Sequence, residues 1–252
     1  MNIKRILNDL ILLTEEAGKA VLEIYNSDAL EVENKADLSP LTNADKDSHQ
    51  ILMNGLSKYG LPVLSEEGKD IAYDERKNWE LYWCIDPIDG TKEFIRKTGE
   101  FTINIGLISG SIPVFGIVYA PVLNKMYIGG DDVSPFCLNG DVKTELKHKV
   151  PRLVEAETVV VASRSHSNNE TQEYINAIKG QIKLISMGSS LKFMLMAEGL
   201  ANIYPRFVPT MEWDTAASHS ILKALGYCIK TVEEEELEYN KEGLLNPSFV
   251  AQ

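Results

Sequence analysis

An apolar run at residues 81–85 ends in two closely spaced carboxylates, Asp86 and Asp89, and this arrangement limits the fold more than any other segment. The run predicts a buried strand, so Asp86 comes where that strand leaves the core. Gly90 and Thr91 follow directly and offer backbone N–H groups and a hydroxyl where a helix can begin, which is favourable for an anion. Carboxylates beside an anion seat can hold hard metal ions next to a phosphate, so we expect metal-assisted phosphoryl transfer.

The composition permits a sizeable core and argues against a nucleic-acid binder. The chain has 252 residues, 44% of them hydrophobic and 25% charged, so it can form one large domain or two halves. A formal net charge of −12 argues against nucleic acid polymers as partners, because counterion release needs clustered Lys and Arg. An acidic protein that takes an anionic substrate needs divalent cations as mediators. The alternative is that the acidity only maintains solubility.

The three cysteines, Cys84, Cys137 and Cys228, are widely spaced and form no C-x-x-C pair. Neither a disulfide framework nor a zinc site is therefore predicted. Residues 1–13 are interrupted by polar side chains and do not read as a signal peptide, and no stretch reaches the roughly 20 apolar residues of a membrane span. We expect a cytoplasmic protein without an integral membrane segment.

Hydrophobic periodicity predicts N-terminal helices at residues 1–25 and 44–59, followed by a β-rich region. Its strands are expected at residues 62–65, 81–85, 101–109, 114–119 and 125–129. Short strands and helices then alternate as in an α/β layer, with strands at 158–162, 183–185 and 201–204 and helices at 169–178, 189–198 and 214–225. The polar segment 141–150 is the expected boundary between an α+β half, residues 1–150, and an α/β half, residues 151–252.

Three further acids are candidates for the same site, and each has a structural alternative. Glu66 follows apolar residues 62–64, as expected of a carboxylate that emerges at a strand end, but taken alone it reads as a solvated loop acid. Asp214 and Asp45 each stand at the start of a predicted helix, where capping the helix N-terminus would explain them equally well.

Several segments together resemble the inositol monophosphatase superfamily of magnesium-dependent, lithium-sensitive phosphatases. The likeness spans nearly the whole chain and is carried by Ser65-Glu66-Glu67, Asp86-Pro87-Ile88-Asp89-Gly90-Thr91 and Trp213-Asp214-Thr215-Ala216-Ala217. Four further segments resemble the 3′(2′),5′-bisphosphate nucleotidases of that superfamily: Lys92-Glu93-Phe94, Ser163-Arg164-Ser165-His166, Gly188-Ser189-Ser190-Leu191-Lys192-Phe193 and Tyr204-Pro205-Arg206-Phe207. The resemblance implies a layered αβαβα sandwich of the inositol monophosphatase and fructose-1,6-bisphosphatase type, an α+β and α/β fold with the site between its halves.

The resemblance also implies a set of metal ligands. Glu66, Asp86 and the carbonyl of Ile88 would hold one Mg²⁺. Asp86, Asp89 and Asp214 would hold a second. All are hard oxygen ligands of the kind that Mg²⁺ prefers.

The resemblance gives Asp45 and Thr91 the task of holding and activating the attacking water, Asp45 through a further metal-bound water. The catalytic set is then Asp45, Thr91 and Glu66, with two or three Mg²⁺ ions as cofactors. Two ions about 3.5–4 Å apart can stabilise the entering and leaving oxygens of an in-line displacement, so no protein nucleophile is needed.

Contacts to a nucleotide follow from the same resemblance. Lys192 and Arg206 are expected near a 5′-phosphate. His166 and Ser163 are expected near the base or sugar. Gly188 and Ser189 are expected to form a second anion-binding site at the start of a helix. The expected substrate-binding set is Asp89, Gly90, Thr91, Ser163, His166, Gly188, Ser189, Lys192, Arg206 and Asp214. The alternative for Lys192 is a solvated helix residue.

The resemblance implies hydrolysis of adenosine 3′,5′-bisphosphate (PAP) to AMP and phosphate in sulfur assimilation, with the sulfated relative PAPS, converted to APS, as a further substrate. The alternatives are an inositol monophosphatase or sugar-bisphosphate phosphatase of the same superfamily, and a non-catalytic module that binds Mg²⁺ and a nucleotide. The expected partner is a small nucleotide, and a monomer and a homodimer are both compatible with the sequence. The resemblance also suggests, as an alternative location, peripheral association with the cytoplasmic side of the inner membrane, but no basic amphipathic helix here requires it.

Overall fold

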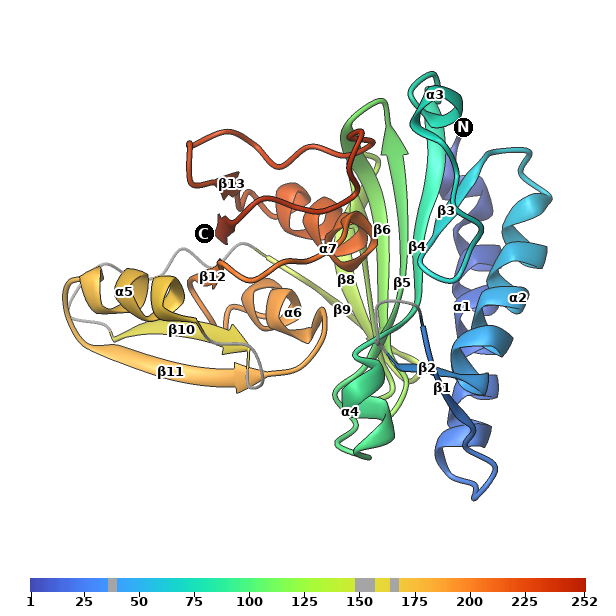
Figure 1. Cartoon of the computed structure of the whole chain (residues 1–252), viewed down its shortest axis with the longest axis horizontal. Coiled ribbons are helices and arrows are strands. Elements are labelled where there is room, and N and C mark those ends of the chain that lie inside the picture. The colour runs from blue at the N-terminus through green and yellow to red at the C-terminus, as the bar shows by residue number, and fades with distance from the viewer. Residues whose placement is uncertain (36–39, 148–156, 164–167) are drawn as a thin grey trace.

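A seven-stranded mixed sheet forms the centre of the fold in the computed structural model, which describes residues 1–35, 40–147, 157–163 and 168–252. In spatial order its strands are β3 (Val63–Ser65), β4 (Leu81–Asp89), β5 (Thr102–Ser109), β6 (Ile112–Ala120), β7 (Lys125–Gly130), β8 (Val133–Asn139) and β9 (Val142–Glu145). β3 runs parallel to β4, and the later neighbouring strands are antiparallel. β4, β5 and β6 are buried along most of their length because helices cover both faces of the sheet (Figure 1).

Two long helices, α1 (Ile3–Tyr25) and α2 (Asn43–Ser57), cover one face of the sheet (Figure 1). Leu10, Ala17 and Val21 recur at helical spacing on α1 and are fully buried. They join strand residues that point to the same side, such as Trp83 and Ile105, in one hydrophobic cluster. This face of the sheet is therefore closed off from solvent.

The helix α7 (Glu212–Ala224) packs across the opposite face, on β4, β5, β6 and β7. Its approach depends on Gly116, because a Cβ there would lie 2.1 Å from the carbonyl oxygen of Ala217. Tyr82 and Cys84 point from β4 to this side and share a second hydrophobic cluster with α7. This packing brings the first turn of α7 to the end of β4.

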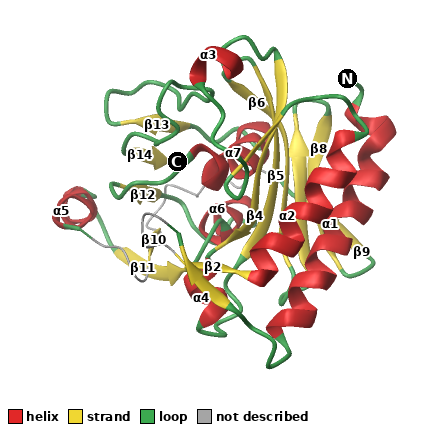
Figure 2. Ribbon diagram, turned by 45° about the vertical axis from the view of Figure 1, so that its right-hand side comes forward, coloured by secondary structure: helices red, strands yellow, loops and turns green. Residues whose placement is uncertain are grey.

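A second β layer lies beyond α7. It consists of the parallel pair β10 (Thr158–Ser163) and β11 (Ile182–Met187) and of the three-stranded sheet β12 (Tyr204–Arg206), β14 (Phe249–Ala251) and β13 (Ile229–Thr231). α6 (Leu191–Ala197) lies with α7 between the two β layers, and α5 (Asn169–Ala177) lies on the outside (Figures 1 and 2). The order of layers is αβαβα, as expected.

Four short elements complete the fold. The hairpin of β1 (Val32–Asn34) and β2 (Pro40–Thr42) leads into α2, α3 (Tyr73–Arg76) precedes β4, and α4 (Thr91–Ile95) follows it. Gly90, between β4 and α4, has a φ of +94°, in the left-handed region that favours glycine. The chain therefore turns sharply where β4 ends.

Most of the predicted helices and strands are present, with shifted ends. Residues 110–113 were expected to form a turn, but β6 already begins at Ile112. Pro113 is accommodated because the pairing of β5 with β6 shifts register beside it. The strand expected at residues 201–204 instead runs from Tyr204 to Arg206 as β12, and β13 and β14 were not predicted.

The expected boundary segment, residues 141–150, is partly a strand. Val142–Glu145 form β9, the exposed outer strand of the central sheet, and polar residues suit that position because one edge faces water. A division at residue 150 stays a prediction, since residues 148–156 lie outside the described part. The three cysteines are unpaired thiols, as expected. None of the helices in the described ranges is long and apolar enough to cross a membrane.

Candidate active site

Three carboxylates converge between the central sheet and α7. Glu66 follows β3, Asp86 lies within β4, and Asp214 is the third residue of α7. One oxygen from each lies within 4.8 Å of one oxygen from each of the others. Asp89, at the end of β4, is close enough for its charge to act on Asp86 and Asp214. The structure thus brings together the acids that the sequence predicted as metal ligands.

The local structure of β4 explains the direction of Asp86. The pairing of β4 with β5 shifts register between Asp86 and Asp89, a β-bulge of the kind that redirects side chains beside functional sites. One oxygen of Asp86, Oδ1, accepts a hydrogen bond from the backbone N–H of Ile88 at 3.0 Å. The other, Oδ2, is buried and has no hydrogen-bond partner among the described residues.

This cluster is electrostatically unfavourable without a cation. Burial first, and the neighbouring carboxylates second, raise the pKa values of Asp86 and Asp214 well above their ordinary range. Burial also raises the pKa of Glu66, although Lys35 opposes this shift from 2.8 Å. A buried, unpartnered carboxylate oxygen within an all-oxygen donor set fits a hard divalent cation such as Mg²⁺.

Lys35 was not predicted as part of the site. Its ammonium also contacts Glu67, at 2.5 Å, and the residue directly follows β1. Burial lowers the pKa of Lys35, but Glu66 and Glu67 raise it further than burial lowers it. Because Lys35 lies 31 residues from Glu66 and belongs to no motif, this contact could not be predicted from the sequence.

Asp45 and Thr91 lie together, as the resemblance implied. Asp45 is the third residue of α2 and accepts hydrogen bonds at Oδ2 from the backbone N–H and the hydroxyl of Thr42, so the capping role considered for it is also present. Its other oxygen, Oδ1, lies 3.4 Å from the Thr91 hydroxyl, which is also 3.3 Å from the carbonyl oxygen of Ile88. Burial raises the pKa of Asp45, and the hydrogen bonds from Thr42 oppose that shift.

Ser190 holds Asp89 in place; it belongs to a segment that carries the resemblance but was not predicted as a site residue. Its backbone N–H and its hydroxyl donate to Asp89 Oδ2 at 2.5 and 2.8 Å. The amide of Asn104, on β5, donates to the Ser190 hydroxyl at 2.9 Å. The backbone N–H of Gly188 donates to Glu100 at 2.8 Å. The N–H of Gly188, which belongs to the expected second anion-binding site, is thus already bound to a protein carboxylate, and so is the N–H of Ser190 that follows that site.

A pocket of about 200 Å³ opens onto the acids. Of the predicted residues, those that line it are Glu66, Asp89, Gly90, Thr91, Gly188, Ser189, Lys192, Arg206 and Asp214. Lys192 is buried rather than solvated; its ammonium donates to the carbonyl oxygen of Ser189 at 2.5 Å and lies 5.5 Å from the centre of the Tyr204 ring. Burial lowers the pKa of Lys192 to about 8. Arg206 carries a buried Nε that has no partner among the described residues.

Two predicted nucleotide contacts, Ser163 and His166, stay predictions. Ser163 is the last residue of β10, and only its backbone is described. His166 lies within residues 164–167, outside the described residues.

Comparisons with known proteins identify the family of this chain. A family model described as "Inositol monophosphatase family" matches residues 4–251. The 3′(2′),5′-bisphosphate nucleotidase CysQ of Escherichia coli strain K12 is 42% identical over 241 residues, which cover 94% of this chain and 95% of that protein. The CysQ of Buchnera aphidicola is 38% identical over 257 residues, covering 98% and 94%.

Solved structures show the same fold. A crystal structure of CysQ from Bacteroides thetaiotaomicron, described as a bacterial member of the inositol monophosphatase family, has 40% identity and a TM-score of 0.88, covering 100% of this chain and 98% of that one. A staphylococcal inositol monophosphatase complexed with products has 19% identity and a TM-score of 0.81, covering 100% and 92%. The second likeness, at this identity, concerns the fold alone.

Proposed function

Because the chain belongs to the inositol monophosphatase family, we propose that it is a magnesium-dependent 3′(2′),5′-bisphosphate nucleotidase. It hydrolyses PAP to AMP and phosphate, and by the same removal of the 3′-phosphate converts PAPS to APS. The observation that carries the proposal is the convergence of Glu66, Asp86 and Asp214 within 4.8 Å, at a pocket that also holds Lys192 and Arg206.

The acids would hold the metal ions. Glu66, Asp86 and the Ile88 carbonyl form one ligand set, and Asp86, Asp89 and Asp214 form a second. When bound, Mg²⁺ supplies Lewis-acid stabilisation of the charge that develops on the entering and leaving oxygens. Neutralisation of the cluster also removes the repulsion that otherwise favours protonated carboxyl groups.

Thr91 and Asp45 position the attacking water. The Thr91 hydroxyl donates to Asp45 Oδ1, which leaves its lone pairs able to accept an O–H of that water. Asp45 is buried with a raised pKa, so it can accept the proton that the water releases through the Thr91 hydroxyl. The water oxygen forms the new bond to phosphorus, the bond to the ribose 3′-oxygen breaks, and that oxygen takes a proton from solvent.

Lys192 and Arg206 would bind the 5′ group. A buried ammonium and a guanidinium among the lining residues complement a second anion, which a nucleoside bisphosphate has and inositol monophosphate lacks. These two cations therefore favour the nucleotide. PAP and PAPS both carry an anionic 5′ group, so both remain substrates.

The test is phosphate release by the purified protein with Mg²⁺ and, in parallel, PAP, PAPS, inositol 1-phosphate and fructose 1,6-bisphosphate. We expect kcat/KM for PAP to exceed the values for the inositol and sugar phosphates by about 100-fold or more. A higher kcat/KM for inositol 1-phosphate would overturn the nucleotidase assignment. Magnesium-dependent nucleotide binding without any phosphate release would instead identify a non-catalytic module.

A further inference from the structure

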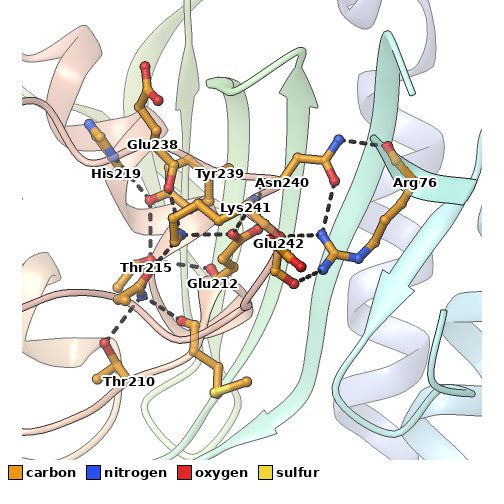
Figure 3. A network of polar contacts seen from close by, with 12 residues as sticks. Arg76, Thr210, Glu212, Thr215, His219, Glu238, Tyr239, Asn240, Lys241 and Glu242 are labelled. Carbon is orange, nitrogen blue, oxygen red and sulfur yellow. Dashed lines mark hydrogen bonds and ion pairs between the residues drawn. The ribbon is translucent and has the colours of Figure 1, made fainter. Parts of the chain in front are cut away.

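A network of polar contacts outside the pocket ties the start of α7 to α3 (Figure 3). Its centre is the segment 238–242, which we call the strap. The strap lies between Arg76, the last residue of α3, and Glu212, the first residue of α7. Both side chains are buried, with exposures of 2% for Arg76 and 0% for Glu212. Buried charges of this kind persist only where many partners compensate them.

Glu212 is held by the strap through both carboxylate oxygens. Oε2 accepts from the backbone N–H of Asn240 at 2.7 Å. Oε1 accepts from the backbone N–H of Lys241 at 3.0 Å and from its ammonium at 2.7 Å. These charge-assisted hydrogen bonds fix the position of the first residue of α7.

Arg76 holds the other side of the strap. Its guanidinium donates to the Asn240 side chain at 3.1 Å and to the carbonyl oxygens of Lys241 and Glu242 at 2.6 and 2.7 Å. The Asn240 amide donates back to the carbonyl oxygen of Arg76 at 2.7 Å. The strap is therefore anchored to the segment that leads into β4, the strand that carries Asp86.

A chain of hydrogen bonds connects the strap to Asp214. The Lys241 ammonium lies 3.3 Å from the side-chain oxygen of Asn246, whose amide donates to the carbonyl oxygen of Met211 at 2.8 Å. The backbone N–H of Met211 donates to Asp214 Oδ2 at 2.8 Å. The orientation of the Asp214 carboxylate thus depends on the residues that the strap holds.

We propose that Glu212 is a positioning residue that acts through the strap to fix Asp214 against Glu66 and Asp86, and so sets the affinity for the divalent cation. Glu212 and Asp214 are two residues apart on one helical turn, so they point in directions about 200° apart. One faces the strap and the other faces the acids. This inference rests on the proposed function, because it assumes that Asp214 is a metal ligand.

Calorimetric titration of Mg²⁺ into the protein without substrate tests the inference. We expect Glu212→Gln to weaken Mg²⁺ binding about 10-fold, since partners that orient metal ligands contribute effects of this size. Glu238→Gln is the matched control, because it removes an exposed carboxylate from the same strap that points away from Arg76 and Glu212 (Figure 3). Its Mg²⁺ affinity should equal that of the wild type. Excess Mg²⁺ should restore kcat in Glu212→Gln. An unfolded variant would not recover activity in this way.

Circular dichroism and thermal unfolding establish whether Glu212→Gln is folded. If it is not folded, Arg76→Lys provides the test from the other side of the strap. This substitution keeps the positive charge but removes the planar guanidinium group and its several N–H donors. We expect about threefold weaker Mg²⁺ binding in that variant. Wild-type affinity in the folded variant, or equal weakening in Glu238→Gln, overturns the inference. Failure of the wild type to bind Mg²⁺ would instead refute the proposed function.

Discussion

Replacement of Asp86 by Asn should stabilise the metal-free protein and at the same time abolish its response to Mg²⁺. Asp86 is fully buried, and its Oδ2 atom has no partner within the described residues. Two other carboxylates, Glu66 and Asp214, each have an oxygen within 4.8 Å of an oxygen of Asp86. Asn has nearly the same shape without the charge. The substitution therefore removes the repulsion together with a metal ligand.

The size of the gain follows from the geometry. At an effective dielectric constant near 20, two unit charges about 4.8 Å apart repel by about 3.5 kcal/mol. Asp86 experiences this repulsion from two carboxylates in addition to burial, and both raise its pKa and favour its protonated form when no metal is bound. Holding a carboxyl group protonated at pH 7.5 costs about 1.36 kcal/mol for each pH unit above its ordinary pKa near 3.9, or about 5 kcal/mol at most. We expect about half of this limit as the gain in unfolding free energy, because the new amide N–H groups need partners of their own. For a chain of this size that is a rise in Tm of about 5–10 °C.

The assay is thermal unfolding of wild type and Asp86→Asn with EDTA and with saturating Mg²⁺. A hundredfold excess of Mg²⁺ over its Kd should stabilise the wild type by about 2.7 kcal/mol and leave the variant unchanged. Phosphate release should fall by at least about 10³-fold. Asp132→Asn, which removes an exposed carboxylate elsewhere, should change none of these quantities. A lower metal-free Tm in Asp86→Asn, or an undiminished Mg²⁺ response, would refute the reasoning.

Three further predictions concern pH, the water and the 5′ end of the pocket. The raised pKa values of Asp86 and Asp214 mean that the folded state binds more protons than the unfolded state. The Tm of the metal-free wild type should therefore fall as pH rises from about 4 towards neutrality. Bound Mg²⁺ should reduce this dependence of Tm on pH. Thr91→Val should lower kcat about 100-fold with unchanged Mg²⁺ affinity by calorimetry, while Thr91→Ser retains most activity. Lys192→Met should raise KM for PAP about 10- to 100-fold but leave KM for phenyl phosphate unchanged. KM of the wild type for PAP should rise above pH 8, where Lys192 loses its charge.

The central part of the site could be predicted because it lies at the ends of strongly patterned strands. The apolar run before Asp86 defines β4, and the short run before Glu66 defines β3. Since these strands are parallel neighbours, the two acids leave the sheet at the same edge. Asp214 could be assigned only through the resemblance, because local sequence explains it equally well as a capping residue, and it does accept a hydrogen bond from Met211.

What the sequence could not predict are contacts between distant segments. Lys35 reaches Glu66 across 31 residues, and Arg76 reaches the strap across more than 160, without any periodicity that marks either pair. The weakest secondary-structure predictions have a related cause. β13 and β14 have three residues each; they pair with each other, and β14 also pairs with β12. No local propensity reveals this pairing.

The hydrogen bonds of the acids distinguish their roles. Backbone N–H groups fix one oxygen each of Asp86, Asp89 and Asp214, which limits rotation of the carboxylates before any ligand arrives. Asp86 then presents a second, buried oxygen that accepts no hydrogen bond from the described residues, which suits a metal ligand. Asp45 differs, because Thr42 takes one of its oxygens and Thr91 contacts the other. A carboxylate occupied in this way is suited to receive a proton through Thr91 and poorly suited to bind a metal directly, so the same type of side chain serves two functions a few ångströms apart.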